Sequence, residues 1–195
     1  MDNIECLQNE LQENSSDLLA HVPILQRLKE LGDVTQTGSS VTGLMVYPDL
    51  DFAIQNDAPD FDRALQLIPS LFSELGATAI KLADFRTPEN RLAGYYIGFD
   101  LPYKGMDWHI DATVGPRGPI VTNPPELANW IESMSAEQRI TILSLKKQLV
   151  DTKRYVGSKS QPPFTFRSTH VYEGVIVGNV STIVDLEEYF SQKSN

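Results

Sequence analysis

Residues 38–54 read GSSVTGLMVYPDLDFAI, and most of what can be inferred about this chain begins there. The stretch opens with a Gly-Ser pair, which follows a short strand predicted over residues 33–37. A helical turn is predicted over residues 40–44. Residues 49–54 then alternate strictly between polar and apolar side chains, which is typical of a half-buried strand. The stretch therefore predicts two strands that are joined by a glycine-serine turn and a short helix.

The second of these strands carries two carboxylates. Asp49 and Asp51 are two residues apart, so their side chains point to the same face of the strand. Two adjacent carboxylates repel each other, and keeping both ionised is unfavourable unless a cation lies between them. Magnesium is a hard cation that takes oxygen ligands. The pair therefore predicts a magnesium site.

The turn that precedes this strand is suited to bind a phosphate. Gly38 allows the backbone to approach a ligand closely, and the N–H groups at a helix start favour an anion. The hydroxyl of Ser39 adds one more donor. Nine residues separate Ser39 from Asp49, so the short helix can return the chain to the next strand. We therefore expect the phosphate-binding turn and the carboxylates to share one cleft.

The combined pattern resembles the signature of the polymerase-β-like nucleotidyltransferase superfamily, over about residues 20–115. In that family a Gly-Ser turn and a short spacer precede Asp-hydrophobic-Asp-hydrophobic. The resemblance implies a third carboxylate on a later strand. Asp111 fits, between Ile110 and Ala112, with Asp107 as a rival on the same strand face. His109 shares that face and is interpreted as a supporting or surface residue.

The resemblance also implies a mechanism and a cofactor. Two Mg²⁺ ions would be held by Asp49, Asp51 and Asp111, with an NTP as substrate and Asp111 beside the attacking hydroxyl. In related members a later lysine and a tyrosine nine residues further on bind the triphosphate. Lys146 and Tyr155 have that spacing here, and Lys147 and Lys153 are alternatives to the lysine.

The rest of the pattern predicts an α+β fold. Helices are expected over the first thirty residues, with a break at residues 14–16, and strands over residues 78–85, 92–99 and 108–114, separated by turns at 87–90 and 102–105. After the prolines at 124–125 we expect helices, one of them capped by Ser135, and basic residues gather between 146 and 167. Residues 170–178 are expected to be helical, although 175–177 also fit a strand. The prediction is a nucleotidyltransferase-type mixed β-sheet with flanking helices, followed by a mainly helical C-terminal region. We expect a catalytic domain over residues 1–115. A helical domain over residues 116–195 would contribute to nucleotide or acceptor binding.

The net charge and the cysteine content limit the classes of binding partner and the compartment that we expect. The formal net charge is −10, which disfavours a generalist nucleic-acid binder, because such proteins neutralise phosphates with a basic face. An acidic surface instead attracts a cationic ligand. The single cysteine, Cys6, favours a reducing cytoplasm, and we expect neither a signal peptide nor a membrane span.

These observations lead to one main hypothesis and two alternatives. The main one is transfer of a nucleoside monophosphate from an NTP to an acceptor hydroxyl on a small molecule, such as an antibiotic. The first alternative is transfer to a protein or to a tRNA 3′ end, as in toxin-like or CCA-adding-like enzymes. The second is an inactive nucleotidyltransferase fold used as a binding or antitoxin module. The intact carboxylates argue against the second alternative.

Overall fold

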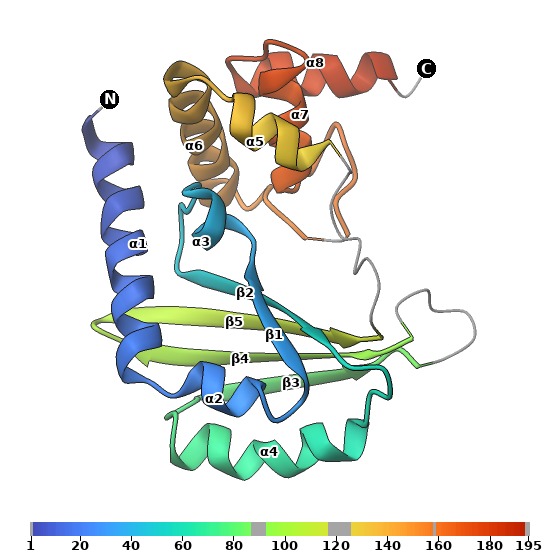
Figure 1. Ribbon diagram of the computed structural model, residues 1–195. Coiled ribbons are helices and arrows are strands. Elements are labelled where there is room, and N and C mark those ends of the chain that lie inside the picture. Colours follow the sequence, from blue (N-terminus) through green and yellow to red (C-terminus); the bar gives the residue numbers. More distant parts are fainter. Residues whose placement is uncertain (1, 87–92, 117–125, 158, 194–195) are drawn as a thin grey trace. The chain divides into compact units, whose positions relative to one another are not determined.

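The computed structural model describes residues 2–86, 93–116, 126–157 and 159–193. The chain forms two compact units, shown in Figure 1. The first, called the sheet unit here, is Glu10–Ile120. The second, called the helical unit, combines Met1–Asn9 with Val121–Asn195. No helix in the described part of the chain is long and apolar enough to cross a membrane.

A five-stranded mixed sheet organises the sheet unit (Figure 1). Its spatial order is β1-β2-β5-β4-β3, and the central pair β2–β5 is parallel while the other pairs are antiparallel. The strands are β1 (Asp33–Thr37), β2 (Asp49–Gln55), β3 (Ala79–Asp84), β4 (Tyr95–Tyr103) and β5 (Met106–Gly115). The predicted mixed sheet with flanking helices is therefore confirmed.

One face of the sheet forms the hydrophobic core. Alternate residues of β2 and β5 point to this face, and those of β5 include Trp108, Ile110 and Val114, all completely buried. Helices α2 (Ile24–Leu28) and α4 (Phe61–Ser73) lie along the same side in Figure 1. The ring of Phe61 in α4 meets that of Tyr95 in β4 edge-on, with centroids 5.6 Å apart. The core therefore leaves the opposite face of the sheet for polar side chains.

Two local predictions were wrong. Helix α1 runs unbroken over Asp2–His21, because the hydroxyls of Ser15 and Ser16 donate to the carbonyl of Gln12 instead of ending the helix. The turn expected over residues 102–105 is also shorter. β4 continues to Tyr103, and Lys104-Gly105 form a two-residue hairpin turn in which both residues have positive φ, 49° and 76°.

Besides the first turns of α1, the described part of the helical unit contains α5 (Leu127–Ser133), α6 (Ala136–Asp151), α7 (Ser168–Ile176) and α8 (Ile183–Lys193). The expected cap at Ser135 is confirmed: its side chain accepts from the N–H of Gln138, whose side chain accepts from the N–H of Ser135. Residues 170–178 were expected to be helical, with a strand as the alternative for 175–177, and they are helical as far as Ile176 in α7. The expected turn at 87–90 and the prolines at 124–125 lie outside the described residues.

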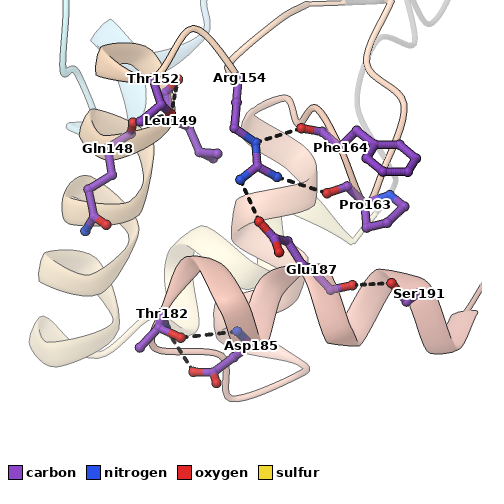
Figure 2. A network of polar contacts seen from close by, with 10 residues as sticks. All are labelled: Gln148, Leu149, Thr152, Arg154, Pro163, Phe164, Thr182, Asp185, Glu187 and Ser191. Carbon is purple, nitrogen blue, oxygen red and sulfur yellow. Dashed lines mark hydrogen bonds and ion pairs between the residues drawn. The ribbon is translucent and has the colours of Figure 1, made fainter.

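The loop before α7 is held by one arginine (Figure 2). Arg154 donates to the carbonyl of Phe164 at 2.8 Å and to that of Pro163 at 3.1 Å. It also pairs with Glu187 of α8 at 2.5 Å. Arg154, one of the basic residues of the stretch between 146 and 167, therefore has a structural role in this unit.

Candidate active site

The parallel pairing of β2 with β5 brings the predicted carboxylates together. In the register of these two strands, Asp51 lies opposite Asp111, and Asp49 lies opposite His109. All four side chains point away from the hydrophobic core. Asp107, the rival third carboxylate, lies opposite Pro102 near the β4–β5 turn. The register therefore places Asp111 beside Asp51, and Asp107 further along the strand.

The pairing of β5 with β4 extends this polar surface. Gly98 lies opposite Asp111, and Asp100 lies opposite His109, on the same face of the sheet as Tyr96. We call this surface the carboxylate face. It consists of Asp49, Asp51, Tyr96, Gly98, Asp100, His109 and Asp111.

The glycine-serine turn packs directly against the carboxylate face. Gly38 has φ 72°, which favours glycine, and a Cβ atom at this position would overlap the carboxyl group of Asp51. Ser39 is the first residue of the short helix α3 (Ser39–Thr42), and Gly43 ends it in the left-handed conformation. The structure therefore brings Gly38 and Asp51 together, as expected from the spacing.

The residue after this pair fixes the turn in place. Ser40 is buried, and its hydroxyl accepts from the side-chain amide of Gln36 at 2.9 Å. Its carbonyl accepts from the side-chain amide of Gln12 in α1 at 2.8 Å. Bonds from both a strand and a helix therefore hold the backbone of the turn, which limits movement of Gly38 and Ser39.

Asp49 is a buried carboxylate with a raised pKa. Its side chain is buried, with the residue only 7% exposed. Burial raises the pKa of Asp49 to about 7, and the negative charges of Asp51 and Asp111 add to the effect. A cation at this position would remove the cause of the shift, so Asp49 has the properties of a metal ligand.

Asp111 has a different environment. Burial favours its neutral form, but hydrogen bonds from His109 and Tyr96 outweigh burial and lower its pKa. Nε2 of His109 lies 3.0 Å from Oδ1 of Asp111, and Nδ1 of His109 lies 2.6 Å from Oδ1 of Asp100. The bond to Asp111, followed by the bond to Asp100, raises the pKa of His109 to about 9. Asp111 is therefore ionised and held by neighbouring side chains.

The donor atoms of this face suit magnesium. Carboxylate oxygens are the ligands that Mg²⁺ prefers, and Asp49, Asp51 and Asp111 supply them from two adjacent strands. Among the residues that the structure describes, no three His, Cys, Asp or Glu side chains are gathered closely enough to hold a metal ion. Mutual repulsion keeps such carboxylates apart without a cation. Asp51 and Asp111 are nearest neighbours on adjacent strands, which lie about 4.8 Å apart, so the backbone holds the starts of these two side chains close together.

Lys146 and Tyr155 form a separate cluster in the helical unit. Lys146 of α6 is 1% exposed, and its Nζ lies 5.8 Å from the ring centroid of Tyr155 and 5.7 Å from that of Tyr172. The hydroxyls of Tyr155 and Ser168 are hydrogen-bonded. Lys147, one of the two alternatives to Lys146, pairs with Asp151 at 2.5 Å. The structure therefore brings Lys146 and Tyr155 together, while their role remains a prediction.

Sequence reasoning missed three contributors to the carboxylate face. Tyr96, Gly98 and Asp100 were not singled out, whereas His109 was expected on this face as a supporting or surface residue. The available signal was the alternation of Tyr96, Gly98 and Asp100 along one strand. That signal identifies a shared face, but the neighbours of each side chain follow only from the β4–β5 register.

The arrangement of the chain is similar to three solved structures. One is a poly(A) polymerase complex, GLD-2–GLD-3, with TM-score 0.56 and 15% identity, covering 90% of this chain and 56% of that one. The second is a cytoplasmic RNA terminal U-transferase, with TM-score 0.55 and 19% identity, covering 86% of this chain and 48% of that one. The third is a mutant of the Cid1 poly(U) polymerase bound to MgATP, with TM-score 0.55 and 16% identity, covering 86% and 49%.

These likenesses establish the fold. The chain shares the fold of these nucleotidyltransferase structures, which is the fold that its Gly-Ser and Asp-x-Asp pattern predicted. It spans about half the length of the solved chains that it matches. No protein-family model matches the sequence, and no curated protein matches it.

Proposed function

We propose that this protein is a Mg²⁺-dependent nucleotidyltransferase that moves a nucleoside monophosphate from an NTP to an acceptor hydroxyl. The observation that carries the proposal is the β2–β5 register, which sets Asp51 beside Asp111 with Asp49 on the same face. Gly38 against Asp51 adds the phosphate-binding turn. Likeness to the fold of poly(A) and poly(U) polymerases supports the same chemistry.

In the proposed reaction, the acceptor oxygen forms a bond to the α-phosphorus of the NTP, the bond to pyrophosphate breaks, and the hydroxyl proton passes to solvent. Asp49, Asp51 and Asp111 would hold Mg²⁺, which would neutralise charge on the phosphates and the leaving pyrophosphate. Gly38 and Ser39 bind a phosphate of the NTP. Because Asp111 has a lowered pKa, it is better suited to bind the cation and orient the acceptor hydroxyl than to remove its proton.

The preferred acceptor in this proposal is a small cationic molecule. A net charge of −10 attracts cations and repels polyanions at long range. An RNA 3′ hydroxyl is the second candidate, favoured by the solved structures, two of which are named for poly(A) or poly(U) synthesis and one for terminal U transfer to RNA. Those structures match 86–90% of this chain, including its helical region.

A labelling panel tests the proposal and separates the acceptors. The protein is incubated with Mg²⁺ and each α-labelled NTP, together with an aminoglycoside, a lincosamide, a short oligoribonucleotide, tRNA or lysate protein. Label on the aminoglycoside or lincosamide supports the first acceptor, and label on RNA supports the second. The Asp49→Asn, Asp51→Asn double variant is the control for site dependence.

Calorimetry with Mg²⁺ and each NTP completes the test. Absence of both label transfer and nucleotide binding would contradict the enzyme hypothesis and favour an inactive fold.

The helical unit offers a second test of the same proposal. If Lys146 and Tyr155 bind the triphosphate, Lys146→Met should raise KM for the NTP more than it lowers kcat. Lys147→Met is the matched control, because Lys147 lies next to it in α6 and pairs with Asp151. Equal KM values for the Lys146→Met and Lys147→Met variants would remove Lys146 from the nucleotide site.

A further inference from the structure

Gly98 occupies an unusual position in the middle of the sheet. It lies on β4 between two charged neighbours, Asp111 on β5 and Lys81 on β3. Its φ is outside the left-handed region, so the backbone does not require glycine there. Glycine within a strand lowers stability and leaves no side chain to pack. The reason for glycine at this position must therefore be space.

Tyr96 fills the space above Gly98. A Cβ atom at Gly98 would lie 2.7 Å from Cζ of Tyr96 and closer still to its hydroxyl oxygen. The ring of Tyr96 thus crosses the position that a side chain at residue 98 would occupy. This path brings the Tyr96 hydroxyl to Asp111, to which it donates a hydrogen bond. Nζ of Lys81 on β3 lies over the ring of Tyr96, 5.7 Å from its centroid.

His109 lies on β5, the same strand as Asp111, and contacts the same oxygen of Asp111. Its Nε2 lies 3.0 Å from Oδ1, the atom that also accepts from Tyr96, so neither bond is made to Oδ2. Asp100 holds the other ring nitrogen at 2.6 Å. Two side chains from different strands therefore fix Asp111 by one oxygen.

We propose that Tyr96 and His109 are positioning residues for Asp111, and that Gly98 is the gap through which Tyr96 reaches it. This inference rests on the proposed function, since Asp111 matters to a metal ion only if the carboxylate face binds one. Tyr96 and His109 hold Oδ1 and leave Oδ2 for the cation. Residues that orient a metal ligand commonly change metal affinity or activity about 10–100-fold when they are replaced.

Metal affinity is the direct test, because it does not depend on the acceptor. Mn²⁺ binding is measured by electron paramagnetic resonance in the presence of a non-hydrolysable ATP analogue. We expect Tyr96→Phe to weaken Mn²⁺ binding about 10-fold. Tyr95→Phe is the matched control, because Tyr95 is adjacent on β4 but points into the core, and it should bind Mn²⁺ like the wild type.

A pair of variants tests the gap itself. Gly98→Ala should displace Tyr96 and weaken Mn²⁺ binding as Tyr96→Phe does. In a Tyr96→Ala background there is no ring to displace, so adding Gly98→Ala should change Mn²⁺ binding no further. Thermal unfolding of each variant shows whether it is folded, and Tyr96→Phe, which removes a single oxygen atom, provides the comparison if Gly98→Ala does not fold.

The outcomes separate the two proposals. If Asp111→Asn weakens Mn²⁺ binding while Tyr96→Phe and His109→Gln match the wild type, the positioning role is overturned and the proposed function stands. If the wild type itself does not bind Mn²⁺ with the nucleotide analogue, the proposed function is contradicted and this inference with it. Weakened binding by Tyr96→Phe and Gly98→Ala, with Tyr95→Phe unchanged, supports the positioning role.

Discussion

The two halves of the carboxylate face differ in what compensates their charge. On β2, Asp49 is buried beside Asp51, and its pKa is raised to about 7. On β5, Asp111 accepts bonds from His109 and Tyr96, and its pKa is lowered although it too is partly buried. In the proposed site, a bound cation would therefore compensate the charge of Asp49, whereas the protein itself supports Asp111. Such a site would combine one preorganised carboxylate with one that a metal ion completes.

The largest expected effect tests whether both halves serve one site. Replacing either Asp51 or Asp111 with Asn should lower the rate of nucleotidyl transfer on the order of 10³-fold, because charge stabilisation dominates this chemistry. Steady-state kinetics with the acceptor from the labelling panel measures the loss. Asp107→Asn is the control on the same strand face and should stay within a few-fold of the wild type. A collapse of the rate with Asp107→Asn and not with Asp111→Asn would reassign the third carboxylate.

The next effect concerns the turn that packs on the β2 half. Gly38→Ala places a methyl group against the Asp51 carboxyl, so we expect a loss of activity of about 100-fold, comparable to removing a preorganised catalytic contact. Gly105→Ala is the control with a similar positive φ, 76° against 72°, but a Cβ there meets nothing within 4 Å.

Thermal unfolding and kinetics of the two glycine variants distinguish backbone strain from contact with the site. Each should lose stability because its φ is positive, and Gly38→Ala should lose more, because the Gly38 ψ of −157° lies in a region that is open essentially only to glycine. Only Gly38→Ala should also lose activity. Equal activity of the two variants would show that the turn does not shape the carboxylate site.

The third effect is the pH dependence of stability, which differs between the two halves of the carboxylate face. Because the pKa of Asp49 is about 7 in the folded protein and 3.8 as its ordinary value, the folded state binds more protons between these pH values. The stability of the metal-free protein should therefore fall as the pH rises from about 4 to 7. Asp49→Asn should remove this fall and stabilise the protein at pH 8 by on the order of 2 kcal/mol.

Denaturant unfolding of the metal-free protein at a series of pH values measures this difference. Saturating Mg²⁺ should stabilise the wild type at pH 8 and stabilise Asp49→Asn much less. If the free energy of unfolding of the wild type and of Asp49→Asn changed with pH in parallel, the pKa of Asp49 would not be raised in the folded state.

The smallest expected effect is the contribution of His109, on the β5 half, to the pH dependence of stability, and it occurs at higher pH than the effect of Asp49. His109 has its pKa raised to about 9 from 6.5, so its contribution to stability is complete below pH 6.5 and lost as the pH rises through 9. His109→Gln should flatten the profile in that window only. The change should be smaller than for Asp49, because the His109 side chain is 45% exposed and solvent screens its interactions. Unfolding curves between pH 6 and 9.5 measure it, and an unchanged slope in the variant would contradict it.

The sequence alone was sufficient to predict which side chains share a face on β2. It was not sufficient to predict which side chains surround Asp111 on β5. Alternation fixes which residues of a strand share a face, so Asp49 and Asp51 were predicted side by side, and strand β1 was predicted with its observed bounds. Neighbours across strands depend on register, which the hairpin turn sets. The expected turn over residues 102–105 was two residues longer than the observed one. A turn of that length does not give the observed β4–β5 register, so the pairing of Asp111 with Gly98 could not be derived from it. The supporting roles of Tyr96 and Asp100 follow from that pairing.

The parallel β2–β5 pair has a consequence for how the protein folds. Asp51 and Asp111 are nearest neighbours in the sheet but 60 residues apart in the chain, and β3 and β4 lie between their strands in sequence. Closing so long a loop is entropically costly, so such contacts form late. The three carboxylates can meet only after synthesis has passed β5, and a nascent chain that ends earlier has no metal site. Metal-dependent protection from hydrogen exchange would therefore report completion of the whole sheet.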